Sequence, residues 1–172
     1  MAEYDYDLIV IGAGPGGYVG AIRAAQLGLK TACVEGRETL GGTCLNVGCI
    51  PSKALISATK MYHKAQHISE MGIKFAGAEV DMIQMQAWKS GIVKKLTGGV
   101  QTLVKGAGTT YVKATAEFLG PHNAKLTYAD GKPEDIVEAE HIVVATGSVP
   151  IEIPGFKFDG KRVIDSTGAL DL

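Results

Sequence analysis

The chain has 172 residues, of which 46% are hydrophobic and 20% are charged, and its net charge is -1. This length suits one domain with a substantial core. A net charge so close to zero excludes the broad basic surface that attracts nucleic acid or an anionic membrane, so we expect neither as a partner. The longest apolar runs, residues 8–11 and 142–145, are far too short to cross a bilayer.

The N-terminal residues and the cysteine content predict the compartment. Residues 1–7 are acidic, unlike a secretory signal or an Arg-rich transit peptide. Three cysteines are too few for a secreted disulfide scaffold. We therefore expect a soluble intracellular chain, cytoplasmic in a bacterium, or in the mitochondrial matrix if a presequence has been removed.

The first 35 residues predict a βαβ unit. Residues 7–11 form a short apolar run typical of a buried parallel strand, and residues 31–35 form a second one. Between them, a helical pattern of apolar residues continues to Leu27 and is stopped by Gly28.

Two longer helices are predicted next. The first begins near Pro51 and ends near residue 70, and the second is capped by Asp81 and continues to Leu103. Three glycines weaken the second helix by up to ~1 kcal/mol each relative to alanine. We expect close packing against another element to compensate at these positions, which are Gly91, Gly98 and Gly99.

The remaining strands complete an α/β fold. Residues 110–118, 125–128 and 136–139 predict a three-stranded antiparallel meander. Residues 140–146 predict a strand that returns to the parallel sheet. We therefore expect a central parallel sheet with helices on one face and the meander on the other, and a ligand at the carboxyl ends of its strands.

A glycine-rich turn lies between the first strand and the first helix. Gly12, Gly14 and Gly17 form a GxGxxG motif, in which the helix N-terminus holds the two phosphates of a dinucleotide. Glu35 ends the second strand, where a carboxylate accepts hydrogen bonds from an adenosine ribose and disfavours a 2′-phosphate. The motif does not separate FAD from NAD, and a turn needed only for packing is the alternative.

Two cysteines stand five residues apart, at Cys44 and Cys49. In a regular helix their Cα atoms would lie about 8–9 Å apart, beyond the reach of a disulfide, so a bond between them requires an irregular backbone. Gly48 and Pro51 favour such a backbone, and we expect residues 41–49 to form a loop. Lys53 lies one helical turn beyond Cys49, where its charge favours a thiolate.

Other readings of these residues remain. The cysteine pair could be buried and structural, or half of a zinc site, although the spacing and the lack of further ligands disfavour zinc. Cys33 lies in an apolar strand and is expected in the core. His63 and His67 are expected on a solvated helix face, so no metal site is predicted.

The glycine turn, followed by GGTCLNVGCIPSKAL at residues 41–55, resembles the pyridine nucleotide-disulfide oxidoreductases. Within that family, the stretch is most similar to the dihydrolipoamide dehydrogenases. ATGSVP at residues 145–150 resembles the family's flavin-domain ATG segment, and DSTGAL at 165–170 resembles the link into its nicotinamide domain.

The resemblance implies a Rossmann-like three-layer FAD-binding domain at residues 1–149 and a linker toward an NAD-binding domain at residues 150–172. The pyrophosphate of FAD would lie at the glycine turn and its adenosine ribose at Glu35. Further cofactor-binding residues implied by the resemblance are Gly41, Gly42, Thr43, Cys44, Lys53, Ala116, Ala145, Thr146 and Gly147.

The resemblance also implies the chemistry and the partners. Cys44 would exchange with dihydrolipoamide, Cys49 would lie beside the flavin ring, and Lys53 would tune the flavin. Electrons would pass from protein-bound dihydrolipoamide through the disulfide and FAD to NAD. The implied partners are the lipoyl domain of a 2-oxo acid dehydrogenase acyltransferase, or the glycine-cleavage carrier, and, in the full-length protein, the second subunit of a homodimer.

Relatives of this kind are much longer, and this chain stops where their second GxGxxG motif would begin. We therefore expect the chain alone to be incomplete and inactive as an enzyme. Two alternatives are a stand-alone adenine-nucleotide-binding module, in which Cys44 and Cys49 act as a thiol switch, and another family member such as mercuric or glutathione reductase.

Overall fold

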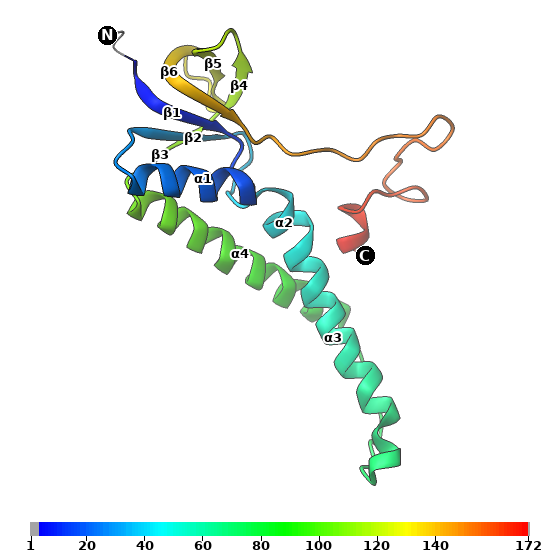
Figure 1. The fold of residues 1–172 in the computed structure, drawn as a ribbon. Helices are drawn as coiled ribbons and strands as arrows, with labels where there is room; N and C mark the ends of the chain where they lie inside the picture. The colour runs from blue at the N-terminus through cyan, green and yellow to red at the C-terminus, as the bar shows by residue number, and fades with distance from the viewer. Residues whose placement is uncertain (1–3, 172) are drawn as a thin grey trace.

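The computed structural model describes residues 4–171. It contains six strands (Figure 1), β1 (Tyr6–Ile11), β2 (Thr31–Glu35), β3 (Thr110–Lys113), β4 (Thr115–Phe118), β5 (Asn123–Thr127) and β6 (Asp135–Val144). Its helices are α1 (Pro15–Gln26), α2 (Gly42–Val47), α3 (Cys49–His67) and α4 (Met82–Gly106), with short 3-10 turns η1 (Ile68–Met71) and η2 (Gly168–Leu170). Within residues 4–171, none of the helices is long and apolar enough to span a membrane.

The strands form one sheet in the order β3-β2-β1-β6-β5-β4. The first four are parallel, whereas β5 pairs antiparallel with both β4 and β6. The predicted βαβ unit, parallel sheet and meander are confirmed, but two strand boundaries were wrong. Residues 110–118 are two strands, because the chain leaves the parallel sheet at the buried Ala114.

The second boundary concerns β6. Residues 136–139 and 140–146 are not two strands, because a single ten-residue strand ends at Val144. Its first half pairs with β5 in the meander, and its second half pairs with β1 in the parallel sheet. The meander and the parallel sheet are therefore rigidly joined through one strand.

Side chains that alternate along the strands fill two separate cores. Ile9 and Ile11 point toward the meander, where they pack with Leu126. Val10 and Cys33 point to the other face, where α1 and α4 cover the sheet. Figure 1 shows the resulting three layers, with the helices on one face of the sheet and the meander on the other, as predicted.

Helix α4 begins as the sequence predicts, because the Asp81 carboxylate accepts a 2.9 Å hydrogen bond from the Gln84 amide. The packing expected at its glycines is wrong. A Cβ atom built on Gly91, Gly98 or Gly99 would meet no neighbouring atom within 4 Å. These glycines face open space, so nothing in the described residues compensates for their low helix propensity.

Helix α3 and the first half of α4 extend beyond the sheet as a pair (Figure 1). Their connection begins with the turn η1, which is followed by Gly72 in the left-handed conformation that glycine favours (φ 79°), and it continues through residues 73–81. The outer part of this pair leaves Met61, Met71 and Ile83 largely exposed.

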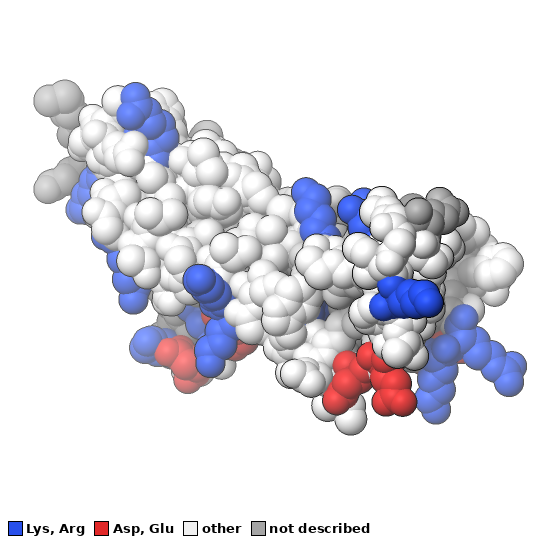
Figure 2. Space-filling view, turned by 90° about the horizontal axis from the view of Figure 1, so that it is seen from below, with Lys and Arg blue, Asp and Glu red and all other residues white. Residues whose placement is uncertain are grey.

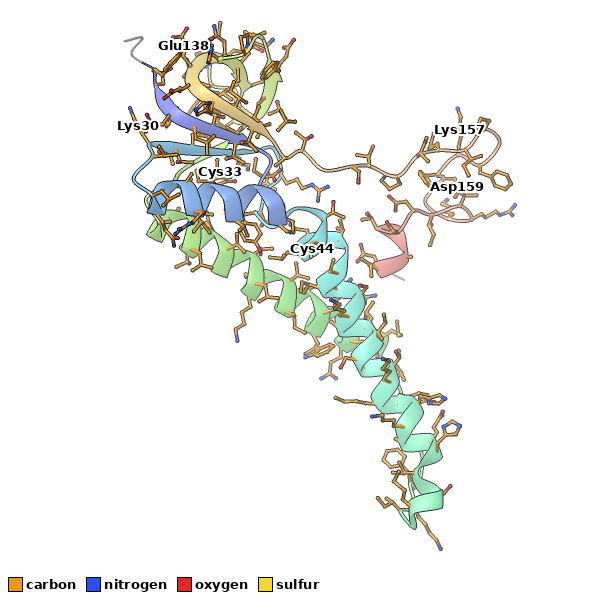
Figure 3. All side chains as sticks on the ribbon, viewed as in Figure 1. Lys30, Cys33, Cys44, Glu138, Lys157 and Asp159 are labelled. Atoms are coloured by element: carbon orange, nitrogen blue, oxygen red, sulfur yellow. The ribbon has the colours of Figure 1, made fainter. Side chains whose placement is uncertain are left out.

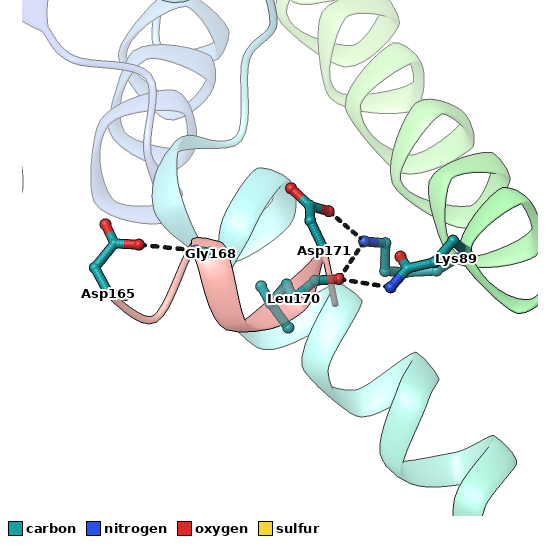
Figure 4. A network of polar contacts seen from close by, with 6 residues as sticks. Lys89, Asp165, Gly168, Leu170 and Asp171 are labelled. Carbon is teal, nitrogen blue, oxygen red and sulfur yellow. Dashed lines mark hydrogen bonds and ion pairs between the residues drawn. The ribbon is translucent and has the colours of Figure 1, made fainter. Parts of the chain in front are cut away.

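The segment after β6 extends away from the sheet and returns to the helices (Figure 1), and Figure 4 shows the contacts that it makes there. The Lys89 ammonium donates a 2.6 Å hydrogen bond to the Leu170 carbonyl and lies 2.8 Å from the Asp171 carboxylate. Lys89 is only 5% exposed. This pairing holds η2 against α4, at the end of the segment expected to act as a linker.

Candidate functional site

A cavity of about 520 Å³ lies at the carboxyl ends of the parallel strands. Its position is the one predicted from the open α/β sheet. Segments that are far apart in the sequence share its wall, including the glycine turn, the end of β2, the start of α2 and the segment that follows β6. The predicted residues that line it are Gly12, Gly14, Glu35, Gly42, Thr43, Cys44, Ala116, Ala145, Thr146 and Gly147.

The three glycines of the turn have different steric roles. A Cβ atom on Gly17 would collide with the Gly12 carbonyl oxygen, so α1 packs tightly on the turn. Gly12 has a φ of 98° and lies against the Ala145 carbonyl. At Gly14, by contrast, a Cβ would meet only the Gly42 Cα, at 3.9 Å. The absence of a side chain at Gly14 is therefore not required by protein packing, and it leaves the cavity wall open to a ligand.

Glu35 is buried, and its carboxylate is held by the backbone. Oε2 accepts a 2.9 Å hydrogen bond from the Ala13 amide, and Oε1 accepts one of the same length from the Arg37 amide. Glu35 thus fastens the glycine turn to the end of β2 while its side chain lines the cavity. Each carboxylate oxygen keeps a further lone pair for a ligand hydroxyl.

Residues 41–44 close the cavity against the glycine turn. The Gly41 amide donates a 2.8 Å hydrogen bond to the Ala13 carbonyl. A Cβ on Gly42 would lie 2.5 Å from the Gly14 Cα, so the two backbones can approach this closely only because residue 42 is glycine. Contacts between these glycines bring the start of α2, and with it Cys44, to the glycine turn.

The backbone between the two cysteines is irregular, as predicted, but residues 41–49 are not a loop. Helix α2 occupies residues 42–47, and Gly48 interrupts it before α3 begins at Cys49. A Cβ on Gly48 would lie 2.8 Å from the Thr43 carbonyl oxygen, so this tight break requires glycine. The loop prediction missed α2 because six residues are too few for a clear helical pattern.

The break brings the two thiols together (Figure 3 labels Cys44 where α2 meets α3). Both are free thiols in this structure. The interaction with the Cys49 side chain, followed by burial, raises the pKa of Cys44 above its ordinary value, and the nearby ammonium of Lys53 partly opposes the shift. Two adjacent thiols, one of which lies in the cavity wall, can form a disulfide and exchange it with another dithiol.

The two cysteines differ in exposure. Cys44 is half-buried and lines the cavity, whereas Cys49 is exposed at the start of α3. Lys53 is exposed one turn further along α3. Of the predicted cofactor-binding residues, Gly17, Gly41 and Lys53 are not in the cavity wall. The first two instead shape the turn and the backbone behind it.

Two polar residues of the cavity wall, Arg37 and Thr115, are not predicted from the sequence. Arg37 follows Glu35 by two residues, so its closeness in sequence to the expected ribose-binding residue could have predicted its place in the cavity wall. Thr115 belongs to β4, and nothing in the sequence pattern places β4 beside the glycine turn. β4 lies there because the chain passes from the parallel sheet into the meander at Ala114.

The remaining candidates are structural. Cys33 is fully buried between the sheet and the helices, and burial raises its pKa to about 11, so it is inert as a nucleophile. The rings of His63 and His67 stack 4.3 Å apart on the exposed face of α3. Among residues 4–171, no group of three or more potential ligands could hold a metal ion.

Comparisons with known proteins match this geometry. The family model described as pyridine nucleotide-disulphide oxidoreductase matches residues 6–172. Dihydrolipoyl dehydrogenase 2, mitochondrial, of Arabidopsis thaliana is 51% identical over 169 residues, which are 98% of this chain and 33% of the relative. Dihydrolipoyl dehydrogenase of Geobacillus stearothermophilus is 51% identical over 166 residues, which are 96% of this chain and 34% of the relative.

A solved structure has the same fold. The crystal structure of LpdA from Mycobacterium tuberculosis superposes with a TM-score of 0.82 at 25% identity, and the match covers 96% of this chain and 37% of that one. The chain thus spans about a third of the length of the proteins it matches. Because the family model extends over nearly every residue, including both cysteines and the glycine turn, the chain belongs to the pyridine nucleotide-disulphide oxidoreductase family.

Proposed function

We propose that this chain is the FAD-binding and redox-disulfide portion of a dihydrolipoyl dehydrogenase. The observation that carries the proposal is the shared cavity, whose wall contains both the glycine turn and Cys44, the first residue of the thiol pair. A nucleotide site and a dithiol that share one wall are suited to pass electrons between a cofactor and a disulfide.

The residues present fit FAD. The cavity has an open wall at Gly14, free amides at the N-terminus of α1, and the buried Glu35 carboxylate for the ribose. Ala116 is a small residue that leaves the backbone of the meander accessible to an adenine ring. FAD, when bound, accepts two electrons and passes them to NAD. The segment 145–147 would close the site over it.

The chain's own part of the reaction is thiol–disulfide exchange. We propose that the dihydrolipoamide thiolate attacks the Cys44 sulfur and that the Cys49 sulfur leaves with the electron pair of the broken disulfide. Attack by the second lipoamide thiol then releases oxidised lipoamide and leaves both cysteines reduced. In this assignment, Cys49 would be the cysteine that lies beside the flavin, and Lys53 would lie on the same side.

The partners follow from the same proposal. They are a lipoyl-bearing carrier, on the acyltransferase of a 2-oxo acid dehydrogenase or in the glycine-cleavage system, and, in the full-length protein, the second subunit of a homodimer. A soluble compartment, the bacterial cytoplasm or the mitochondrial matrix, is proposed with them. In the alternative, a stand-alone thiol switch, the cavity would bind a nucleotide that takes no part in redox chemistry. The high identity to dihydrolipoyl dehydrogenases disfavours this alternative.

The test is FAD binding, measured by titration of flavin fluorescence. We expect binding by the full chain, and at least a tenfold loss of affinity in Gly14→Ala, since the added methyl group obstructs the approach of the pyrophosphate. The matched control is Gly20→Ala on the open side of α1, where an added Cβ meets nothing within 4 Å. Equal affinities in both variants would contradict the proposed site.

A further inference from the structure

Lys89 is a buried lysine in a helix whose other lysines reach solvent. Only 5% of its surface is accessible, whereas Lys94, Lys95 and Lys105 of α4 are exposed. Figure 2, seen from below, shows Lys and Arg side chains that extend into solvent on this face. A buried ammonium group is costly to remove from water unless it is paired and hydrogen-bonded. Lys89 therefore needs specific partners.

The helices themselves supply no acidic partner for Lys89, because none of the four α-helices contains an Asp or Glu. The partners come instead from the segment after β6 (Figure 4). The Leu170 carbonyl accepts a 2.6 Å hydrogen bond from Lys89, and the Asp171 carboxylate lies 2.8 Å from the ammonium group. The Asp171 side chain is 74% exposed, so water weakens its ion pair. We therefore expect the Leu170 carbonyl to be the more important partner.

The segment that reaches Lys89 begins in the wall of the candidate site. Its first residues, 145–147, line the cavity of that site, and its last described residue is Asp171. We call residues 145–171 the strap. Its last turn is held by the Asp165 carboxylate, which accepts a 2.8 Å hydrogen bond from the Gly168 amide at the start of η2. The strap thus has an ordered end, and Lys89 attaches that end to the helices.

A second cavity, of about 280 Å³, lies beside the attached end of the strap. Its wall is shared between the strap and the two helices that carry the cysteines. The strap contributes Thr167, Leu170 and Asp171, and the helices contribute Asn46 and Val47 of α2 and Pro51 of α3. These three helix residues lie on both sides of the Gly48 break. The attached strap therefore bounds the space beside the junction of α2 and α3.

Helix α2 separates the two cavities. Its first residues, up to Cys44, line the cavity of the candidate site, whereas Asn46 and Val47 line the second cavity. Cys49 follows directly after Gly48, so the two cysteines stand on opposite sides of the junction. Any movement of α2 relative to α3 changes the distance between their sulfur atoms. A restraint on the junction is therefore a restraint on the cysteine pair.

We propose that Lys89 is a positioning residue for the cysteine pair and acts through the strap that it clamps to α4. The clamped strap limits movement of α2 toward the second cavity, so the Cys44 and Cys49 side chains keep the interaction that they have in this structure. A disulfide forms only over a narrow range of Cα separations, so this restraint favours the disulfide over the dithiol. The inference rests on the proposed function in one respect, which is that the two thiols form a disulfide.

The test compares three variants of the full chain. Lys89→Met keeps an aliphatic stem of similar length and removes the ammonium group, and Met is about as good a helix former as Lys. Asp165→Ala releases the last turn of the strap without altering an α-helix. The matched control, Lys95→Met, makes the first chemical change at an exposed position of the same helix.

The first measurement is hydrogen exchange of the amides of residues 168–171, which donate hydrogen bonds within the attached end of the strap. We expect exchange at least tenfold faster in Lys89→Met and in Asp165→Ala, and unchanged in Lys95→Met. This measurement reports the attachment of the strap and does not depend on the redox chemistry of the cysteines.

The second measurement is the equilibrium of the cysteine pair with glutathione. Two glutathione thiols reduce the disulfide to the Cys44 and Cys49 thiols and are themselves joined as one oxidised glutathione, so electrons and protons balance. We expect the equilibrium constant for forming the protein disulfide to fall three- to tenfold in Lys89→Met and Asp165→Ala, a tenfold change being about 30 mV. Lys95→Met should keep the parent value. A contact that only stabilised the fold would leave this constant unchanged.

The contrary outcomes are distinguishable. If exchange at residues 168–171 is not faster in Lys89→Met, Lys89 does not clamp the strap and the inference is wrong. If exchange is faster but the glutathione equilibrium is unchanged, the strap does not position the thiols, and the proposed function survives without the inference. If Lys89→Met does not fold, Asp165→Ala decides by the same criteria. If the parent chain forms no disulfide between Cys44 and Cys49, the proposed function fails together with the inference.

Discussion

The Ala13 amide and the Glu35 carboxylate, twenty-two residues apart, are joined by a buried 2.9 Å hydrogen bond. It links the glycine turn to the end of the neighbouring strand. The other carboxylate oxygen is occupied by the Arg37 amide. The residue expected to recognise a ribose therefore also maintains the shape of the glycine turn.

A substitution of Glu35 tests this dual role. Glu35→Gln places an amide group against two backbone donors and can accept from only one of them well. We expect a loss of about 1.5–3 kcal/mol in the free energy of unfolding, typical of a lost hydrogen bond to a charged group, measured by urea denaturation. Glu38→Gln is the control, since the carboxylate that pairs with Lys113 is largely exposed and should contribute less than about 1 kcal/mol. Similar losses in the two variants would contradict the structural role of Glu35.

The close contact of Gly17 with Gly12 predicts a severe defect in Gly17→Ala. The new methyl group would overlap the Gly12 carbonyl, so α1 must move away from the turn. We expect a loss of stability of about 1–3 kcal/mol or more, measured by thermal unfolding. Gly20→Ala on the same helix should instead be stabilising by about 1 kcal/mol, because its site is open. A stable Gly17→Ala variant would show that the turn does not need this contact.

The open glycines of α4 predict gains in stability. Gly98→Ala and Gly99→Ala each add a methyl group where nothing lies within 4 Å and replace a poor helix former. Each should raise the free energy of unfolding of this chain by about 0.5–1 kcal/mol in urea. A destabilised variant would indicate a packing contact at that glycine, as the sequence alone had led us to expect.

The accuracy of the sequence-based predictions depended on how local the signals are. Gly12 and Asp81 act on neighbouring backbone through rules that a short stretch of sequence contains, and the turn and the helix cap predicted for them are confirmed. The place of Glu35 at the end of β2 is also confirmed, whereas its bond to Ala13, twenty-two residues away, was not predicted. By contrast, the division of residues 110–118 into β3 and β4 depends on which strands pair across the sheet, as does the continuity of β6. No local sequence pattern encodes this pairing. The same is true of Thr115, whose place in the cavity wall follows from the crossing at Ala114.

The three thiols should differ in reactivity toward iodoacetamide. Cys49 is exposed and should be modified first in the reduced chain. Cys44 should react more slowly near neutral pH, because its raised pKa lowers its thiolate fraction, and its rate should still be rising above pH 9. Cys33, buried and with a pKa of about 11, should react only after unfolding. Peptide mapping by mass spectrometry at several pH values measures all three rates, and early labelling of Cys33 would contradict the described core.

We propose that the cavity and the cysteine pair form one flavin–dithiol site. It is tested most directly by the visible absorption spectrum of the full chain with bound FAD, recorded anaerobically before and after addition of a dithiol. We predict new long-wavelength absorbance on reduction, retained in Cys44→Ser and lost in Cys49→Ser, because the proposed assignment places the Cys49 thiolate against the flavin. A chain that binds FAD but gives no such absorbance, or gives it equally in both variants, would contradict the assignment.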